Sequence, residues 1–186
     1  MNPAFHHLYE KYHQDVFQFL VYMIRDRDQA EDLVQEVYIR VFKSYDRFEG
    51  KSHEKTWLFS IARNVAIDFL RKQTSWKNRV MNLFDWTSNQ LTDNNLLPEE
   101  VAIQSEEVAM MYRCLDTCTV DQRSVVILRY IQSLSIQETA AILGWTESKV
   151  KTTQHRAIQA LRKEMTRLAE KEGSNNEQRK MERKTN

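Results

Sequence analysis

The chain has 186 residues, a formal net charge of +1, and only three glycines and two prolines. This length allows one large or two small domains, each with a modest core. The scarcity of Gly and Pro favours long helices and argues against an all-β fold or a Gly-rich phosphate-binding loop. No apolar run is long enough to cross a bilayer, and the N-terminus lacks a secretory signal pattern. We therefore expect an all-α, cytoplasmic protein with no direct membrane insertion.

The small net charge conceals blocks of opposite sign. Residues 40–79 carry 10 Lys/Arg against 4 Asp/Glu, and residues 147–167 carry 6 against 2. Residues 1–39 and 85–121 are acidic, with 7 Asp/Glu against 3 Lys/Arg and 8 against 1. Two basic blocks separated by an acidic block predict two contacts with nucleic acid and an intervening segment that avoids phosphate.

The first two predicted helices are amphipathic. Apolar residues recur at helical spacing over Phe5–Ile24 and again over about Gln29–Tyr45. The second helix is expected to bury Leu33, Val34, Val37, Tyr38, Val41 and Phe42. Asp32 and Glu36 lie one turn apart on its opposite face and could chelate a metal or act as a catalytic pair. No third carboxylate converges on them in the sequence, so a basic protein partner is the better functional interpretation.

A cationic loop over residues 46–56 precedes the third predicted helix, which Ser52 can cap. This helix has an apolar face that includes Trp57 and Leu58, and a polar face with Arg63 and Asn64. A cationic loop beside Asn and Arg, with aromatic residues underneath, suits the binding of unpaired DNA. Taken alone, the same pattern is equally compatible with a solvated helix face.

Helical periodicity fails after Gln73, where Asn, Asp, Thr and Ser accumulate. We therefore predict a first domain over residues 1–75, an acidic linker over 76–98, a second domain over 99–172 and a disordered tail over 173–186. The two cysteines, Cys114 and Cys118, have no nearby partners at metal-ligand spacing, and neither do the histidines of the first helix. We expect packing cysteines and no bound metal or cofactor, although the sequence leaves a redox role open.

The second domain contains two capping boxes, Thr119 with Gln122 and Ser135 with Glu138, each of which predicts the start of a helix. Gly144 is expected to end the helix that Ser135 begins, and Thr146 can cap the next one. Small Ala140, Gly144 and β-branched Val150 favour a helix-turn-helix.

The second helix of this predicted motif presents polar residues suited to the major groove: Lys151, Thr152, His155 and Arg156. The alternative is an αα-hairpin whose cations form a solvated face.

Two stretches of the chain resemble a known family. AEDLVQEVYIRVFKSYDRFEG followed by KTWLFSIARNVAIDFLRKQ is similar to region 2 of the extracytoplasmic-function sigma factors of the sigma-70 family. DQRSVVILRYIQSLSIQETAAILGWTESKVKTTQHRAIQALRK is similar to their region 4. The resemblance implies two helical domains joined by a flexible linker, and a function in promoter-specific transcription initiation with core RNA polymerase.

The resemblance also implies roles for individual residues. Asp32, Gln35 and Glu36 match positions that bind the β′ clamp helices of polymerase, and region 4 is expected at the β flap. Lys51, Ser52, His53 and Asn64 match the surface that melts and reads the minus-ten element. Lys151, Thr152, His155 and Arg156 fall on the helix that reads the minus-thirty-five element. A membrane-anchored anti-sigma factor is the implied regulator.

The sequence departs from the family pattern at His53, Glu54 and Lys55, and at Lys151 and His155. The promoter sequences that relatives recognise are therefore not assigned to this chain. Two other classes of function fit the sequence less well. An operator-binding dimeric regulator leaves the acidic helix unexplained and needs a dimerisation seam that the sequence does not show. A Mg²⁺-dependent nucleic-acid enzyme needs a third convergent carboxylate.

Overall fold

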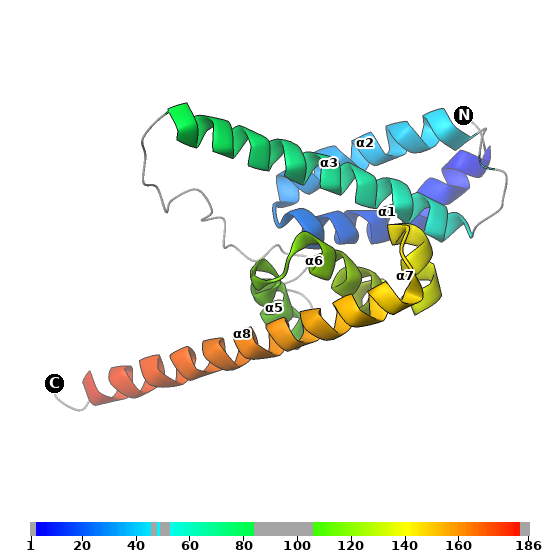
Figure 1. Ribbon diagram of the computed structural model, residues 1–186. Helices are drawn as coiled ribbons and strands as arrows, with labels where there is room; N and C mark the ends of the chain where they lie inside the picture. The colour runs from blue at the N-terminus through cyan, green and yellow to red at the C-terminus, as the bar shows by residue number, and fades with distance from the viewer. Residues whose placement is uncertain (1–2, 46–47, 49–52, 84–105, 183–186) are drawn as a thin grey trace.

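The computed structural model describes residues 3–45, 48, 53–83 and 106–182, and its regular elements over these ranges are all helices (Figure 1). The all-α prediction is confirmed. The helices form an N-terminal bundle, α1–α3, and a C-terminal bundle, α5–α8. Within these ranges no helix is both long and apolar enough to span a membrane.

The N-terminal bundle consists of α1 (Pro3–Ile24), α2 (Arg27–Ser44) and α3 (Glu54–Leu83). Asp26 caps α2, since its carboxylate accepts a hydrogen bond from the Gln29 amide at 3.0 Å. Five consecutive residues of α1, Phe19 to Met23, are all 0% exposed. Consecutive helical residues point in different directions, so this last part of α1 is covered on every side rather than along one stripe.

The C-terminal bundle begins with α5 (Glu106–Cys114) and the 3₁₀ turn η2 (Leu115–Thr117). Next come α6 (Val120–Val126) and the π-helical segment η3 (Ile127–Ile131). The helix-turn-helix is formed by α7 (Ile136–Leu143) and α8 (Glu147–Glu182). Both predicted capping boxes are present, and Gly144 has φ of 65°, in the left-handed region. These predicted helix boundaries are therefore confirmed.

Two helices extend past the segment boundaries expected from the sequence. Helix α3 continues to Leu83 through residues assigned to the linker, and α8 continues to Glu182 through most of the predicted disordered tail. Neither extension contains proline, and adding residues to an existing helix requires no new nucleus, so loss of an apolar stripe does not end these helices. The rest of the predicted linker, the predicted domain start at residue 99 and the last four residues of the tail lie outside the described residues.

The two bundles share one continuous apolar core. Helix α1 contacts α6 and η3 of the C-terminal bundle, while α7 packs against α3 (Figure 1). At the contact, the rings of Tyr22 and Tyr112 meet edge to face with centroids 5.4 Å apart. The C-terminal bundle therefore covers the side of Phe19–Met23 that α2 and α3 leave open.

Candidate nucleic-acid and protein interfaces

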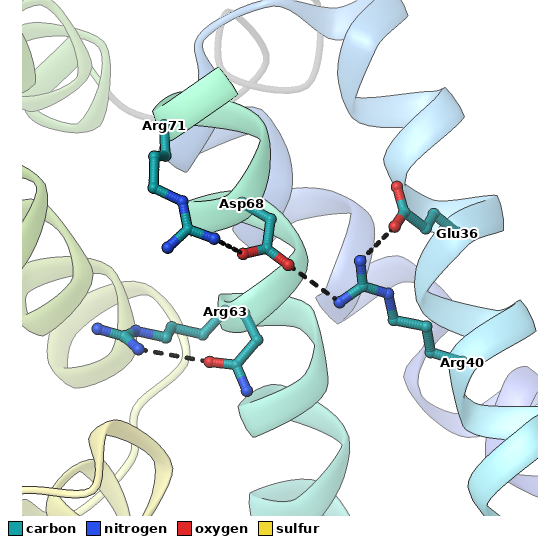
Figure 2. A network of polar contacts seen from close by, with 6 residues as sticks. Glu36, Arg40, Arg63, Asp68 and Arg71 are labelled. Atoms are coloured by element: carbon teal, nitrogen blue, oxygen red, sulfur yellow. Dashed lines mark hydrogen bonds and ion pairs between the residues drawn. The ribbon is translucent and has the colours of Figure 1, made fainter. Parts of the chain in front are cut away.

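The acidic face of α2 is ordered by an ion-pair network that reaches α3 (Figure 2). Arg40 pairs with Glu36 one turn earlier on α2 and with Asp68 of α3, at 3.3 Å. Asp68 also accepts a hydrogen bond from Arg71 at 2.8 Å. The network links the two helices and offsets the charge of Glu36 before any partner binds.

The other two predicted residues of this face are exposed. Asp32 and Gln35 project from α2 into solvent, whereas Glu36 is half-buried beside Arg40. A groove between α1 and α2 runs alongside Gln35 and is also lined by Tyr9, His13 and Tyr38. Burial raises the pKa of Tyr38, so its hydroxyl stays protonated at neutral pH.

An apolar patch continues the acidic face. Ile39 is 54% exposed and Phe42 is 60% exposed. The prediction that Phe42 is buried is wrong, because its ring meets Phe5 edge to face at 5.6 Å on one side while most of its surface stays open. Ile39 lies one turn beyond Gln35. An apolar residue outside the buried stripe of a helix could have indicated this exposed patch from the sequence. A face that combines carboxylate and exposed apolar groups suits a protein partner.

The candidate site for unpaired DNA lies at the start of α3. His53 and Asn64 are both exposed, and the Asn64 side-chain oxygen accepts a hydrogen bond from Arg63 at 3.4 Å (Figure 2). Eleven residues separate His53 from Asn64, which corresponds to about 16 Å along a helix. Lys51 and Ser52, which were predicted to belong to the same surface, lie outside the described residues.

Aromatic rings lie beside this site, as the sequence predicted. The rings of Phe48 and Trp57 are 4.7 Å apart and tilted by 31°, and the ring of Tyr45 lies edge-on to Trp57 at 6.1 Å. Trp57 remains partly exposed. Aromatic faces of this kind can stack an unpaired base, and stacking tolerates any base because each has a π-face.

The candidate duplex-reading surface is the first part of α8. Lys151, Thr152, His155 and Arg156 are all exposed, at positions i, i+1, i+4 and i+5, so they share one side of the helix. On the opposite side, Val150 is 0% exposed and fixes α8 against the bundle. The predicted exposure of these four side chains is confirmed, and the helix that carries them is the second helix of the helix-turn-helix.

Local contacts orient the start of this helix. The Thr146 hydroxyl accepts a hydrogen bond from the Lys149 amide at 3.2 Å, as expected of an N-cap. The Lys149 ammonium lies 3.8 Å from the centre of the Trp145 ring. One turn further on, Gln154 accepts from Arg129 at 3.1 Å and donates to the Tyr130 hydroxyl at 2.9 Å. These contacts tie α8 to η3 and set its orientation.

Metal and thiol chemistry have little support in the described residues. Within them, no group of three or more His, Cys, Asp or Glu side chains is placed to hold a metal ion. Cys114 and Cys118 are buried free cysteines, and burial raises the pKa of both thiols. A raised pKa lowers the thiolate fraction and therefore the reactivity.

Comparison with known proteins identifies the family. Sigma-70 region 2 matches residues 8–75, and sigma-70 region 4 matches residues 109–161. The chain belongs to the sigma-70 family of RNA polymerase sigma factors, within its extracytoplasmic-function group. Members of this group are alternative sigma factors, which direct transcription initiation by RNA polymerase. The N-terminal bundle is therefore region 2, and the C-terminal bundle is region 4.

Two curated relatives come from Bacillus subtilis. The chain is 57% identical to the extracytoplasmic-function sigma factor SigX over 91% of this chain and 88% of that protein. It is 31% identical to the sigma factor YlaC over 89% of this chain and 94% of that protein.

Two solved structures share the fold. The sigma factor RpoE of Bartonella quintana, in complex with the anti-sigma factor NepR, matches with a TM-score of 0.69 and 24% identity, covering 88% of this chain and 97% of that chain. CnrH, in complex with the cytosolic domain of CnrY, matches with a TM-score of 0.64 and 20% identity, covering 89% and 90%.

Proposed function

We propose that the exposed face of α2 binds core RNA polymerase through Asp32, Gln35 and Glu36, at the β′ clamp helices. Asp32 supplies a charge that no ion pair offsets among the described residues, and Gln35 supplies an exposed amide. Glu36 is already paired with Arg40, so its first role is to hold α2 against α3 through that arginine. Ile39 extends the contact with apolar surface that becomes buried on binding.

The two DNA elements are assigned to separate bundles. Region 2 takes the unpaired minus-ten strand at His53 and Asn64, with Lys51 and Ser52, which directly precede His53 in the sequence, and with the ring of Trp57 available for stacking. Region 4 places Lys151, Thr152, His155 and Arg156 in the major groove of the minus-thirty-five element and contacts the β flap. The observation that carries this assignment is that each bundle presents one exposed polar face suited to one form of DNA.

The mechanism requires no covalent step from this chain. Each base contact discriminates by about 1–3 kcal/mol, so one bundle alone selects a promoter poorly. Joining both bundles on polymerase makes the second contact intramolecular and raises its effective concentration. Polymerase acts in the cytoplasm, where we place this protein. One of the two solved structures holds its sigma factor in complex with the anti-sigma factor NepR, and the other holds CnrH with the cytosolic domain of CnrY, which supports an anti-sigma factor as a partner of this chain. We propose that this partner is anchored in the membrane.

Run-off transcription with bacterial core polymerase on a genomic fragment library tests the proposal. The chain should direct initiation at a discrete set of promoters, and Asp32→Arg should reduce that initiation at least tenfold. Glu10→Arg is the matched control. Glu10 is an exposed carboxylate on α1, and its substitution makes the same charge change at a position outside α2. Equal losses in both variants would refute the α2 assignment. No initiation with the unaltered chain would refute sigma activity and favour an operator-binding regulator.

A further inference from the structure

One side of α1, together with its C-terminal end, makes polar contacts with region 4. The stripe on this side of the helix contains three residues spaced by three and four positions: Asp15, Gln18 and Tyr22. Arg25 follows at the end of the helix. Near the start of the stripe, the Gln132 side-chain amide donates to the Asp15 carbonyl oxygen at 3.2 Å and to the Gln18 side-chain oxygen at 3.3 Å. Gln132 is 5% exposed, so these two acceptors replace water around its amide.

The end of the stripe is held by charge. Helix α1 stops at Ile24, which leaves its last carbonyl groups without helical partners. Arg123 of α6 donates to the Met23 carbonyl oxygen at 2.9 Å and so brings a cation to the negative end of the helix dipole. Burial lowers the pKa of Arg123, and the nearby positive charge of Arg25 lowers it further.

A single carboxylate lies between these two arginines. Asp116 forms an ion pair with Arg25 and lies 3.9 Å from Arg123. The guanidinium of Arg25 also lies 4.8 Å from the centre of the Tyr112 ring. Both arginine side chains are only 12% exposed, so removing Asp116 would leave two buried like charges side by side. The closed arrangement of the bundles therefore depends on specific polar pairings as well as on apolar burial.

This arrangement places region 4 on the proposed DNA surface of region 2. Helix α7 packs against α3, and the negative charge of Glu138 at the start of α7 interacts with His53 and Lys55. The negative charge of Glu138 would repel a DNA phosphate that approaches His53. The two promoter elements are also centred about 25 base pairs apart, which is roughly 85 Å of duplex at 3.4 Å per base pair. Reading faces on bundles packed against each other do not span that separation.

We propose that Gln132, Arg123 and Asp116 form an interdomain latch that keeps the free chain closed, and that the latch is released when both promoter elements are bound. The latch is defined by its contacts alone, whereas its effect on DNA binding rests on the function proposed above. Gln132 is the most specific component of the latch. A carboxylate at this position would be repelled by the two acceptor oxygen atoms in the closed state and would be hydrated by water in the open state.

The test is Gln132→Glu, measured by energy transfer between dyes on Gln73→Cys of α3 and Lys171→Cys of α8. Both positions are exposed, whereas Cys114 and Cys118 are buried and react slowly by comparison. Gln137→Glu is the matched control, since Gln137 is an exposed glutamine of region 4 and the substitution adds the same charge. We expect Gln132→Glu to raise the open population at least tenfold and Gln137→Glu to leave it unchanged.

Far-UV circular dichroism and run-off transcription with core polymerase accompany this measurement. A latch variant should keep its helix content and its transcription activity, which a misfolded chain would lose. Equal energy transfer in the unaltered chain and in Gln132→Glu would overturn the latch, as would loss of helix content in Gln132→Glu. If the unaltered chain shows no transcription while the energy transfer changes as expected, the latch stands and the sigma function fails.

Discussion

Gly144 offers a direct test of how the turn of the helix-turn-helix is stabilised. Its φ of 65° lies in the left-handed region, and its position allows the Trp145 amide to donate to the Ala140 carbonyl oxygen at 2.9 Å. A Cβ atom added at this residue would meet no heavy atom within 4 Å. Gly144→Ala therefore introduces backbone strain into the folded state without a steric clash.

The expected magnitude follows from two opposing terms. A left-handed conformation costs a residue with a Cβ about 1–2 kcal/mol. Replacing glycine also restricts the unfolded chain, which returns about 0.4–1 kcal/mol. The net loss for Gly144→Ala should be about 1 kcal/mol, or roughly 2–4 °C in Tm for a chain of this size. Gly144→Asn should lose about half as much, because asparagine tolerates this conformation better.

Urea unfolding followed by far-UV circular dichroism measures both variants. Gly144→Ala should lower the unfolding midpoint without changing the slope of free energy against urea concentration. A loss of more than about 3 kcal/mol, beyond what the strain of one residue explains, would show that the added methyl group clashes. Equal losses for alanine and asparagine would show that the left-handed conformation is not the cause.

Two further predictions concern α7. Thr139 is 0% exposed, and its hydroxyl has no hydrogen-bond partner among the described residues. Thr139→Val should therefore raise the free energy of unfolding, measured with urea, by about 1 kcal/mol. A lower free energy of unfolding would show that the hydroxyl does have a partner. The hydrogen bond from Ser135 lowers the pKa of Glu138 below its usual 4.5. The ionised Glu138 side chain therefore contributes fully to stability above pH 4.5. This contribution is lost as the pH falls through the pKa of Glu138 in the folded state, which is the lower of its two values. Glu138→Gln should flatten the decline in stability on the acid side, and an unchanged decline would contradict the capping role.

Much of the candidate site could be predicted because local chemistry determines it. Ser135, Glu138, Gly144 and Thr146 specify the helix boundaries of the helix-turn-helix through hydrogen bonds to neighbouring backbone groups and a left-handed residue. The exposure of Lys151 and its neighbours follows from the spacing of the apolar residues on α8. These features depend on residues within two turns of one another.

Other features could not be predicted from periodicity. The apolar stripe of α2 included Phe42, but the covering surface of α1 ends at Phe5 and leaves most of that ring open. Helices α3 and α8 continue beyond their apolar stripes because extension of a helix needs only compatible residues and no packed face. In each case the result depends on what lies around the helix, or on whether a helix already exists to extend.

The sequence by itself determined the helical class, the capping boxes, the helix-turn-helix and the exposed polar faces of α2 and α8, because these follow from local spacing and side-chain chemistry. It also contained the uninterrupted apolar run from Phe19 to Met23, which one amphipathic interface does not require. Only the tertiary structure showed that region 4 covers the second side of that run. Gln132, Arg123 and Asp116 are between about 90 and 120 residues from their partners along the chain, and long-range polar pairings of this kind leave no periodic pattern in a sequence.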